Sequence, residues 1–458
     1  MKIALIATHL GPLPGTAGVE ADAYPRDPAR RVLSLARALA EREHDVTVYA
    51  RQESAAAADR QCLWPGVAVE EIPAGPRRPL PADKLLRHVE AYGARLAERW
   101  RHSPPDVAHA HCSAGGAAAL AAARGLGIPV AATFHVPGAG APGDHRPPPG
   151  TGAHAQMRAS VAHGAQAVLA ETAMEGSRLR RLGLAAASVR IVPPGVDTAR
   201  FHPSGPQAER GSRARLLVVG QPGDQRDLYT VLRVLADLPD AELVIAGGPE
   251  RGRLARDPGY RALTRLARNL GVGSRLTCTG RVAEADMPPL MRSADVVVHI
   301  TAGPRFAMVP AEAMACGTAV VVAADGAHAD AVIHANTGFL VPPARPAMLA
   351  RLTRQLVANP MLRDGYGIAA ASRVRDRYSW ERISQETLAV YQALQGSRNR
   401  DSAGALPLLG RITRQGRGEG PEPRPCARQG SNPGHQQAQE GRRGDDDIAA
   451  PQFAVIAR

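Results

Sequence analysis

Short apolar runs recur along the chain and alternate with segments that have helical periodicity. These runs lie at residues 2–7, 46–50, 107–111, 216–219, 296–300 and 319–322. Apolar runs without polar alternation are typical of parallel strands that are buried on both faces. Between the first two runs, Val32, Leu35 and Leu39 share one face of a helix expected from about residue 27 to 42. This alternation predicts an α/β fold built on doubly wound parallel sheets.

The same patterns place the remaining elements. We expect further strands at 67–72, 130–133, 167–170, 189–192, 242–246 and 276–278. We expect further helices at 82–101, 117–124, 153–164, 173–182, 227–238, 260–270, 285–293, 346–358, 360–376 and 380–394. A Pro-Pro-Gly turn within 192–203 separates the two halves of this pattern. After residue 395 the chain is rich in Gly, Pro, Arg and Gln without periodicity, which predicts a disordered tail over 396–458.

The stretch from Phe306 to Pro343 is the most informative part of the chain. It predicts a helix over 309–315, a C-terminal Gly317 and a buried strand over 319–322. Glu312 lies one turn into this helix, where its carboxylate can accept hydrogen bonds from a vicinal diol. The free N–H groups at the helix start can face phosphate oxygens. Together these features favour a nucleotide site.

The sequence of this stretch resembles that of a known family. The runs PAEAMACGTAVV and TGFLVPP, and VPPGVD further upstream, are similar to those of the family-4 retaining glycosyltransferases, which share the GT-B fold. The resemblance covers residues 1 to about 395. It implies two facing Rossmann-like domains with a cleft between them: an acceptor-side domain over 1–197 and a donor domain over 198–378. A final helix over 379–395 is then expected to cross back to the first domain.

The resemblance also implies an activity and its partners. The expected reaction moves a hexosyl group from a UDP- or GDP-linked sugar to an acceptor that the sequence does not identify. Retention is thought in this family to proceed without an enzyme nucleophile, so stabilisation of the leaving diphosphate carries most of the catalysis. No metal or other cofactor is expected, and no Ser/His/Asp set or carboxylate pair is convincing in this sequence.

Site residues follow only where this sequence matches the family's motifs. Glu312 is expected to bind the ribose hydroxyls of the donor. His135, in the run Thr-Phe-His, is expected near the sugar and the leaving group, as the catalytic residue. The other expected donor-binding residues are Gly220 in the phosphate loop, Arg226 beside the diphosphate, the backbone of Met308 and Val309 facing the diphosphate, and Arg281 and Val282 framing the base.

Three positions depart from the family. Pro304 stands where a Glu usually holds the hexose hydroxyls, and Gln221 stands where the phosphate loop usually has an Arg. Arg26-Asp27 replaces a Gly-Gly pair in the first domain. A hydrogen bond to a charged group contributes about 1.5–3 kcal/mol, so several such losses weaken a donor site strongly. They leave open a catalytically silent binding or scaffold protein of the same fold and, as a weaker alternative, a nucleotide-sugar epimerase.

Charge changes this picture little. The formal net charge is +13, of which +3 comes from residues 396–458. A basic surface can attract nucleic acid, an anionic membrane or a phosphorylated substrate. No tight basic run stands out, which favours scattered solvated arginines, and no nucleic-acid partner is expected. Peripheral membrane contact through Arg178, Arg180 and Arg181 is the alternative to a solvated helix face.

The cysteines and the N-terminus bear on the compartment. Five cysteines are far apart, and neither Cys-x-x-Cys nor a Cys/His metal spacing occurs. This pattern is typical of reduced thiols in a reducing compartment. The N-terminal apolar run is short and is interpreted as a first strand, and no stretch reaches 18 apolar residues. We therefore expect a cytoplasmic protein.

Overall fold

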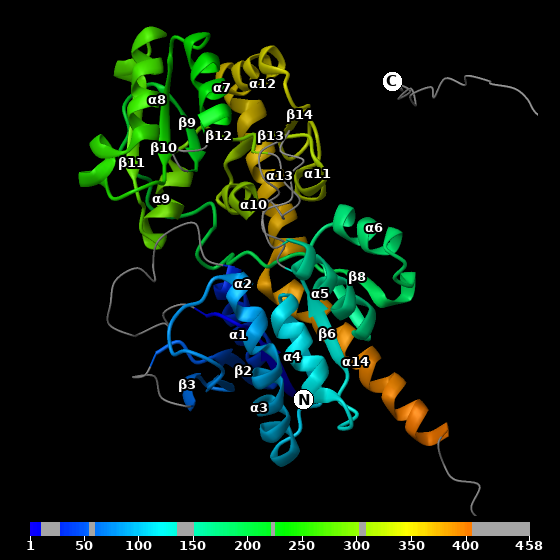
Figure 1. The fold of residues 1–458 in the computed structure, drawn as a ribbon. Helices are drawn as coiled ribbons and strands as arrows, with labels where there is room; N and C mark the ends of the chain where they lie inside the picture. The colour runs from blue at the N-terminus through cyan, green and yellow to red at the C-terminus, as the bar shows by residue number, and fades with distance from the viewer. Residues whose placement is uncertain (11–27, 55–59, 135–150, 221–224, 302–307, 405–458) are drawn as a thin grey trace, which may run out of the picture. The chain divides into compact units, whose positions relative to one another are not determined.

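The computed structural model describes residues 1–10, 28–54, 60–134, 151–220, 225–301 and 308–404. Two sheets organise this part of the chain, and helices flank both (Figure 1). The predicted α/β class with two doubly wound sheets is confirmed. Of the predicted disordered tail over 396–458, residues 396–404 are helical and residues 405–458 lie outside the described residues.

The first sheet has eight strands in the order β3-β4-β2-β1-β5-β6-β7-β8. Their bounds are β1 Lys2–Ile6, β2 Asp45–Arg51, β3 Arg60–Trp64, β4 Val67–Ile72, β5 Val107–His111, β6 Val130–Thr133, β7 Ala167–Ala170 and β8 Val189–Ile191. All pairs are parallel except β3 with β4. The helices of this half are α1 Pro28–Ala40, α2 Ala82–Leu85, α3 Val89–His102, α4 Ser113–Ala123, α5 Thr151–Gly164 and α6 Ala173–Arg181.

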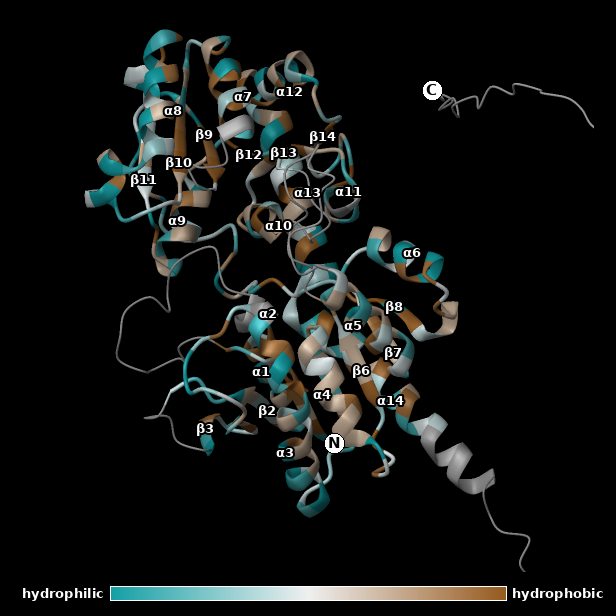
Figure 2. Cartoon of the chain, in the orientation of Figure 1, coloured by the Kyte–Doolittle hydropathy of each residue, from teal (hydrophilic) through white to brown (hydrophobic). Residues whose placement is uncertain are grey.

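Burial on both faces explains why the strands of this sheet are apolar throughout. In β1, Ile3 and Leu5 pack towards α1 and α14, whereas Ala4 and Ile6 pack towards α3 and α4. Successive side chains of a strand point to opposite faces, so each must be apolar when helices cover both. Figure 2 shows the result, with hydrophobic residues concentrated in the strands.

The second sheet has six parallel strands in the order β11-β10-β9-β12-β13-β14. Their bounds are β9 Ala214–Val219, β10 Ala241–Ala246, β11 Leu276–Gly280, β12 Val296–His299, β13 Ala319–Ala323 and β14 Phe339–Val341. The helices that follow are α7 Gln225–Ala236, α8 Pro258–Asn269, α9 Met287–Arg292, α10 Met308–Ala315, α11 Gly326–Ala331, α12 Pro346–Ala358, α13 Pro360–Tyr378 and α14 Trp380–Gly404. The order reverses between β9 and β12, which makes their carboxyl ends the switch point of the sheet.

Helix α14 packs against the first sheet although it follows the second in sequence. It contacts α1 and β5. Tyr391 of α14 is fully buried, and its hydroxyl is hydrogen-bonded to Nδ1 of His109 on β5 at 2.6 Å. Tyr378 lies just before α14, and its carbonyl accepts a hydrogen bond of 2.7 Å from the backbone N–H of Val196. This part of the fold therefore depends on contacts between residues almost 300 positions apart.

The structure differs from the sequence-based prediction at several elements. The helix expected over 82–101 is split into α2 and α3 by a short 3₁₀ turn at Leu86–His88. The antiparallel edge strand β3 was not predicted, because only part of it is apolar and it pairs on one side alone. Helix α14 continues to Gly404, beyond the residue 395 at which the change in composition predicted its end.

A close approach of α10 and α13 makes one glycine structurally demanding. A Cβ atom added at Gly367 in α13 would lie 2.0 Å from the carbonyl oxygen of Gly317, which follows α10. Gly317 has a φ of 75°, as expected at the end of a helix. Because backbone meets backbone here, the clash cannot be relieved by rotating a side chain.

We predict that Gly367→Ala lowers the free energy of unfolding by about 1–3 kcal/mol, as overpacking does elsewhere. Gly365→Ala is the matched control in the same helix, because a Cβ there meets nothing within 4 Å. That control should be neutral or stabilising by up to about 1 kcal/mol, since Ala favours a helix over Gly. Chemical denaturation of both variants measures the difference. Equal stabilities would contradict the close approach.

Candidate functional site

The switch point of the second sheet gathers several of the predicted donor residues. Gly220 directly follows β9, and β12, its neighbour in the sheet, ends at His299. Helix α10 begins at Met308, after the chain leaves β12, and packs against that strand. In open α/β sheets the ligand crevice lies outside the carboxyl ends of the strands at such a reversal. The geometry thus makes the switch point the candidate ligand site.

The backbone comes close together beside Gly220. The N–H of Gly220 donates to the carbonyl of Ala246 at 3.0 Å. Gly247 has a φ of 131°, and a Cβ there would lie 2.4 Å from the carbonyl oxygen of Gly220. Only glycine fits such an approach, so the ends of β9 and β10 form a tight backbone surface. A surface of this kind allows the phosphates of a ligand to approach main-chain groups closely.

Glu312 is buried in α10, with only 4% of its surface exposed. It lies in the second turn, with Met308 and Val309, both half-buried, in the first. A buried carboxylate next to a helix start and a strand end can accept hydrogen bonds from ligand hydroxyls. The placement is compatible with the predicted ribose contact, which stays a prediction.

The other predicted site residues follow β11 or begin α7; Gly280, just before Arg281, accepts a hydrogen bond of 2.9 Å from the N–H of Gly247. Arg281 is exposed and Val282 half-buried, just after β11, the outermost strand on the β10 side of the sheet. Arg226 lies in the first turn of α7. The remaining positions discussed for the site fall outside the described residues: Arg26, Asp27, His135, Gln221 and Pro304. His135 comes directly after Phe134, close to the end of β6.

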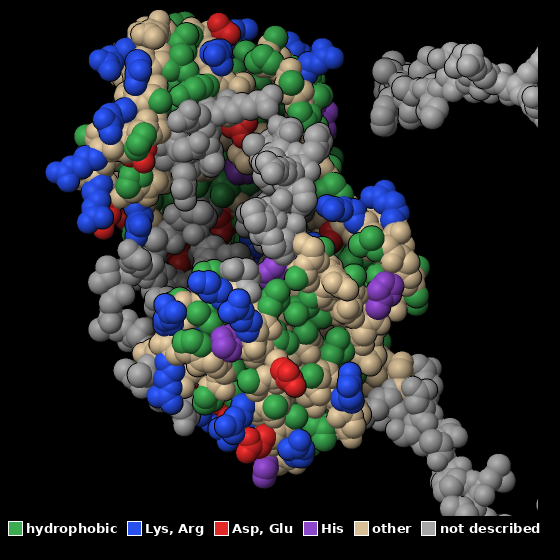
Figure 3. Space-filling view, in the orientation of Figure 1, with side chains coloured by type: hydrophobic (Ala, Val, Ile, Leu, Met, Phe, Trp, Pro, Cys, Tyr) green, Lys and Arg blue, Asp and Glu red, His purple; other side chains and the backbone are tan. Residues whose placement is uncertain are grey.

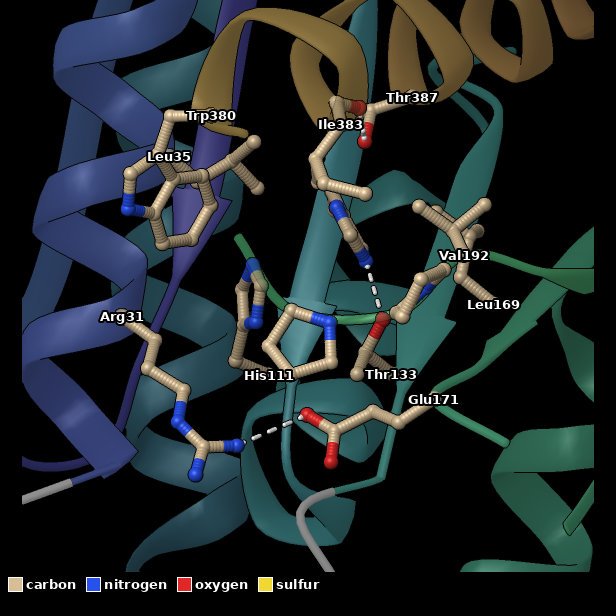
Figure 4. Close-up of a pocket in the computed structure, with 13 residues that line it drawn as sticks. Arg31, Leu35, His111, Thr133, Leu169, Glu171, Val192, Trp380, Ile383 and Thr387 are labelled. Atoms are coloured by element: carbon tan, nitrogen blue, oxygen red, sulfur yellow. Dashed lines mark hydrogen bonds and ion pairs between the residues drawn. The ribbon is translucent and has the colours of Figure 1, made fainter. Parts of the chain in front are cut away.

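A second group of polar side chains surrounds a small cavity at the carboxyl ends of β5, β6 and β7 (Figure 4). The strands contribute His111, Thr133 and Glu171, and Arg31 reaches in from α1. Trp380, Ile383 and Thr387 of α14 also line it. The cavity measures about 40 Å³. That is room for a few water molecules or for the hydroxyl-bearing end of a larger molecule.

Charge is concentrated at one side of this cavity. Glu171 is 5% exposed, and its carboxylate pairs with the Arg31 guanidinium at 3.4 Å. A carboxylate oxygen of Glu175, one turn later, accepts a hydrogen bond of 2.8 Å from the Glu171 backbone. Burial, together with the neighbouring Glu171 charge, raises the pKa of Glu175 to about 8. Near neutral pH the Glu175 carboxyl group is therefore protonated, because two adjacent buried negative charges are unfavourable.

Two histidines on β5 complete the cavity wall. Nε2 of His109 lies 2.8 Å from the Thr133 hydroxyl, and its Nδ1 is bonded to Tyr391. The rings of His109 and His111 lie 4.3 Å apart between centroids. His109 therefore joins two strands and α14 in one buried network. Among the residues described by the structure, no group of three or more His, Cys, Asp or Glu is arranged to hold a metal ion.

Sequence analysis missed this cavity, although one signal was present. Three of its polar residues, His111, Thr133 and Glu171, end or directly follow a buried strand. The partnership of Arg31 with Glu171 joins positions 140 residues apart, and no local pattern contains that information.

Comparisons with known proteins agree with this geometry. Residues 28–200 match the family model "Glycosyltransferase Family 4", and residues 204–373 match "Glycosyl transferases group 1". A D-inositol 3-phosphate glycosyltransferase of Xylanimonas cellulosilytica is 31% identical over 417 residues, which cover 85% of this chain and 96% of that protein. The enzyme of the same name from Mycobacterium tuberculosis is 30% identical over 87% of this chain and 84% of its own.

Solved structures share the fold. Sucrose-phosphate synthase from Thermosynechococcus elongatus has a TM-score of 0.71 at 22% identity, covering 86% of this chain and 99% of its own. Anabaena HepE in complex with UDP-glucose has a TM-score of 0.61 at 17% identity, covering 86% and 100%. The chain belongs to the family-4 glycosyltransferases and has the GT-B fold. It is a glycosyltransferase, and none of these relatives supports the alternative of a silent scaffold.

The raised pKa of Glu175 predicts how stability changes with pH. A carboxyl group whose folded pKa of about 8 exceeds its ordinary 4.5 favours the folded state fully below 4.5. That contribution is lost as the pH rises through 8. Glutamine is neutral at every pH. We predict that in Glu175→Gln the free energy of unfolding falls by a few kcal/mol less between pH 5 and pH 9 than it does in the wild type.

Denaturant unfolding at pH 5, 7 and 9 tests this prediction. Glu90→Gln is the matched control, because it makes the same chemical change at an exposed position of α3. Identical pH dependence in the two variants would show that Glu175 does not carry the effect.

Proposed function

We propose that this protein transfers a hexosyl group, with retention, from a UDP-linked sugar to a hydroxyl group of a small phosphorylated polyol. The observation that carries the donor side is the buried Glu312 on α10, beside the switch point of the second sheet. Anabaena HepE, which shares the fold, was solved with UDP and with UDP-glucose. The names of the curated relatives support a phosphorylated cyclitol as acceptor. A GDP-linked donor is the alternative within the same mechanism.

The donor site works through groups that this chain provides at the switch point. Glu312 accepts hydrogen bonds from the two ribose hydroxyls. The N–H groups of Met308 and Val309 at the start of α10 face the diphosphate, and the tight backbone at Gly220 lets the phosphates approach. Arg226, in the first turn of α7, adds a positive charge. These groups stabilise the leaving diphosphate as its charge develops, and His135 acts next to the sugar.

The acceptor lies at the carboxyl ends of the strands of the first sheet. A hydroxyl-bearing end enters the cavity of about 40 Å³, which is too small for a nucleotide sugar. There it meets the Thr133 hydroxyl, His111 and the Glu171 carboxylate. The Arg31 guanidinium, at the rim with 17% of its side chain exposed, attracts a phosphate group on the acceptor.

The surroundings of the protein follow from the same proposal. No helix in the described part of the chain is both long and apolar enough to cross a membrane. Figure 3 shows Lys and Arg side chains gathered over α6, where Arg178, Arg180 and Arg181 are exposed. We propose a cytoplasmic enzyme, where its nucleotide-sugar donor is made, and these arginines are the surface for any peripheral contact with an anionic membrane.

The first prediction of this proposal concerns the donor. UDP and UDP-glucose should raise the melting temperature of the wild type, by mass action on the folded state. Glu312→Gln should weaken both about ten- to a hundred-fold, the effect of losing a hydrogen bond to a charged group. Glu209→Gln, an exposed glutamate of the same half, is the control. If only GDP compounds bind, the donor is linked to GDP and not to UDP. If no nucleotide binds, the proposal is overturned.

The second prediction concerns the acceptor. With D-inositol 3-phosphate and the donor that binds, Arg31→Ala should raise the KM for the acceptor about ten-fold while leaving the KM for the donor within two-fold. Arg37→Ala, on the exposed face of the same helix, is the matched control and should change neither value. Donor turnover without acceptor would indicate an epimerase or hydrolase. Donor binding without any turnover would indicate a silent binding protein.

A further inference from the structure

Two histidine rings face each other at the switch point of the second sheet. His299 is the last residue of β12, and His328 lies in the short helix α11 that follows β13. Their ring centroids are 5.3 Å apart, with an angle of 59° between the planes. His328 is 2% exposed, and His299 is half-buried. The donor site as described above does not use either residue.

Asp325 contacts both the ring and the backbone of His328. Its Oδ1 lies 2.5 Å from Nδ1 of His328 and also accepts the backbone N–H of the same residue at 3.2 Å. An ionised carboxylate can only accept hydrogen bonds, so Nδ1 carries a proton. In the neutral imidazole, Nε2 of His328 is then an acceptor. The carboxylate also holds the ring in one orientation.

Nε2 of His328 is buried and has no hydrogen-bond partner among the residues that the structure describes. Buried polar atoms in native proteins are almost always paired, so one that is not indicates a missing partner. Burial and the neighbouring His328 lower the pKa of His299 to about 3, which makes it a neutral ring with one donor and one acceptor. The pair therefore offers the neutral ring of His299 and, where His328 is the neutral imidazole, an unpaired acceptor nitrogen.

The position of the pair limits what this partner can be. Helix α10, which bears Glu312, packs against both β12 and α11. His299 ends the strand next to β9, which Gly220 follows. A ligand held by Gly220 and α10 therefore passes close to the two rings. In the neutral imidazole this acceptor nitrogen does not pair with a phosphate oxygen, because both are acceptors. It requires an O–H or N–H group, and the hydroxyls of a sugar supply several.

We propose that His328 and His299 bind the hexose hydroxyls of the donor, with His328 Nε2 accepting from one hydroxyl and Asp325 positioning its ring. This inference rests on the proposed function. It names the part of the donor site that determines which sugar is bound. It assigns the two histidines to sugar specificity and leaves the nucleotide to Glu312, Gly220 and the start of α10.

Two conservative substitutions separate this role from a structural one. His328→Asn keeps a donor near the position of Nδ1, and so the contact with Asp325, but has no atom at the position of Nε2. His328→Gln places a polar atom near Nε2 but gives up the Nδ1 contact. We expect His328→Asn to weaken the binding of UDP-glucose about ten-fold, or about 1.4 kcal/mol, and His328→Gln to retain part of the affinity. Free UDP should bind both within two-fold of wild type.

Isothermal titration calorimetry of the full chain with UDP, UDP-glucose and UDP-N-acetylglucosamine measures these effects, and melting temperatures report on folding. His299→Leu, at the half-buried member of the pair, should also reduce UDP-sugar binding while leaving UDP unchanged. His334→Leu, an exposed histidine of the same half, is the control and should change neither.

Each outcome has one meaning. If wild type binds neither UDP nor a UDP-sugar, the UDP-linked donor of the proposed function is excluded and this inference fails with it. If it binds UDP-sugars no better than UDP, or if His328→Asn and His299→Leu keep the sugar-dependent gain, only this inference is overturned. Equal loss of UDP and UDP-sugar would assign the pair to the nucleotide or to folding, and would overturn it as well.

Discussion

The burial of parallel strands on both faces is the constraint on which the candidate sites depend. Helices cover each sheet, so a polar side chain within a strand would lie in an apolar core. Polar groups are free to appear where a strand ends, and parallel strands end on one side. His111, Thr133 and Glu171 collect at that edge of the first sheet, and Gly220 and His299 at that edge of the second. The chemistry of both halves follows from the same geometry.

Helix α14 ties the end of the chain to the first of these edges. The hydrogen bond between Tyr391 and His109 is buried, and His109 also bonds Thr133. A residue that lines the cavity is therefore held by a helix that follows both sheets in the sequence. Because removing one partner of a buried hydrogen bond leaves the other unsatisfied, the cavity and the packing of α14 depend on each other.

Resemblance and structure contribute differently to the site. Local sequence motifs predicted four donor-binding residues: Glu312, Gly220, Met308 and Val309. The structure places them beside the switch point, and their roles stay predictions. The pair His299 and His328, and its neighbour Asp325, could not be recognised in this way. Their significance lies in a distance between rings and in an unpaired buried nitrogen, neither of which a motif contains.

The sequence by itself determined the α/β class, most strands and the helix that carries Glu312, because apolar periodicity and turn residues are local signals. The edge strand β3, the break between α2 and α3 and the pairing of Arg31 with Glu171 were decided only by the tertiary structure. The physical reason is that strand pairing, burial and desolvation depend on which distant segments meet. A chain pattern specifies which face of an element is apolar, but the partner of each polar group is chosen when the elements pack.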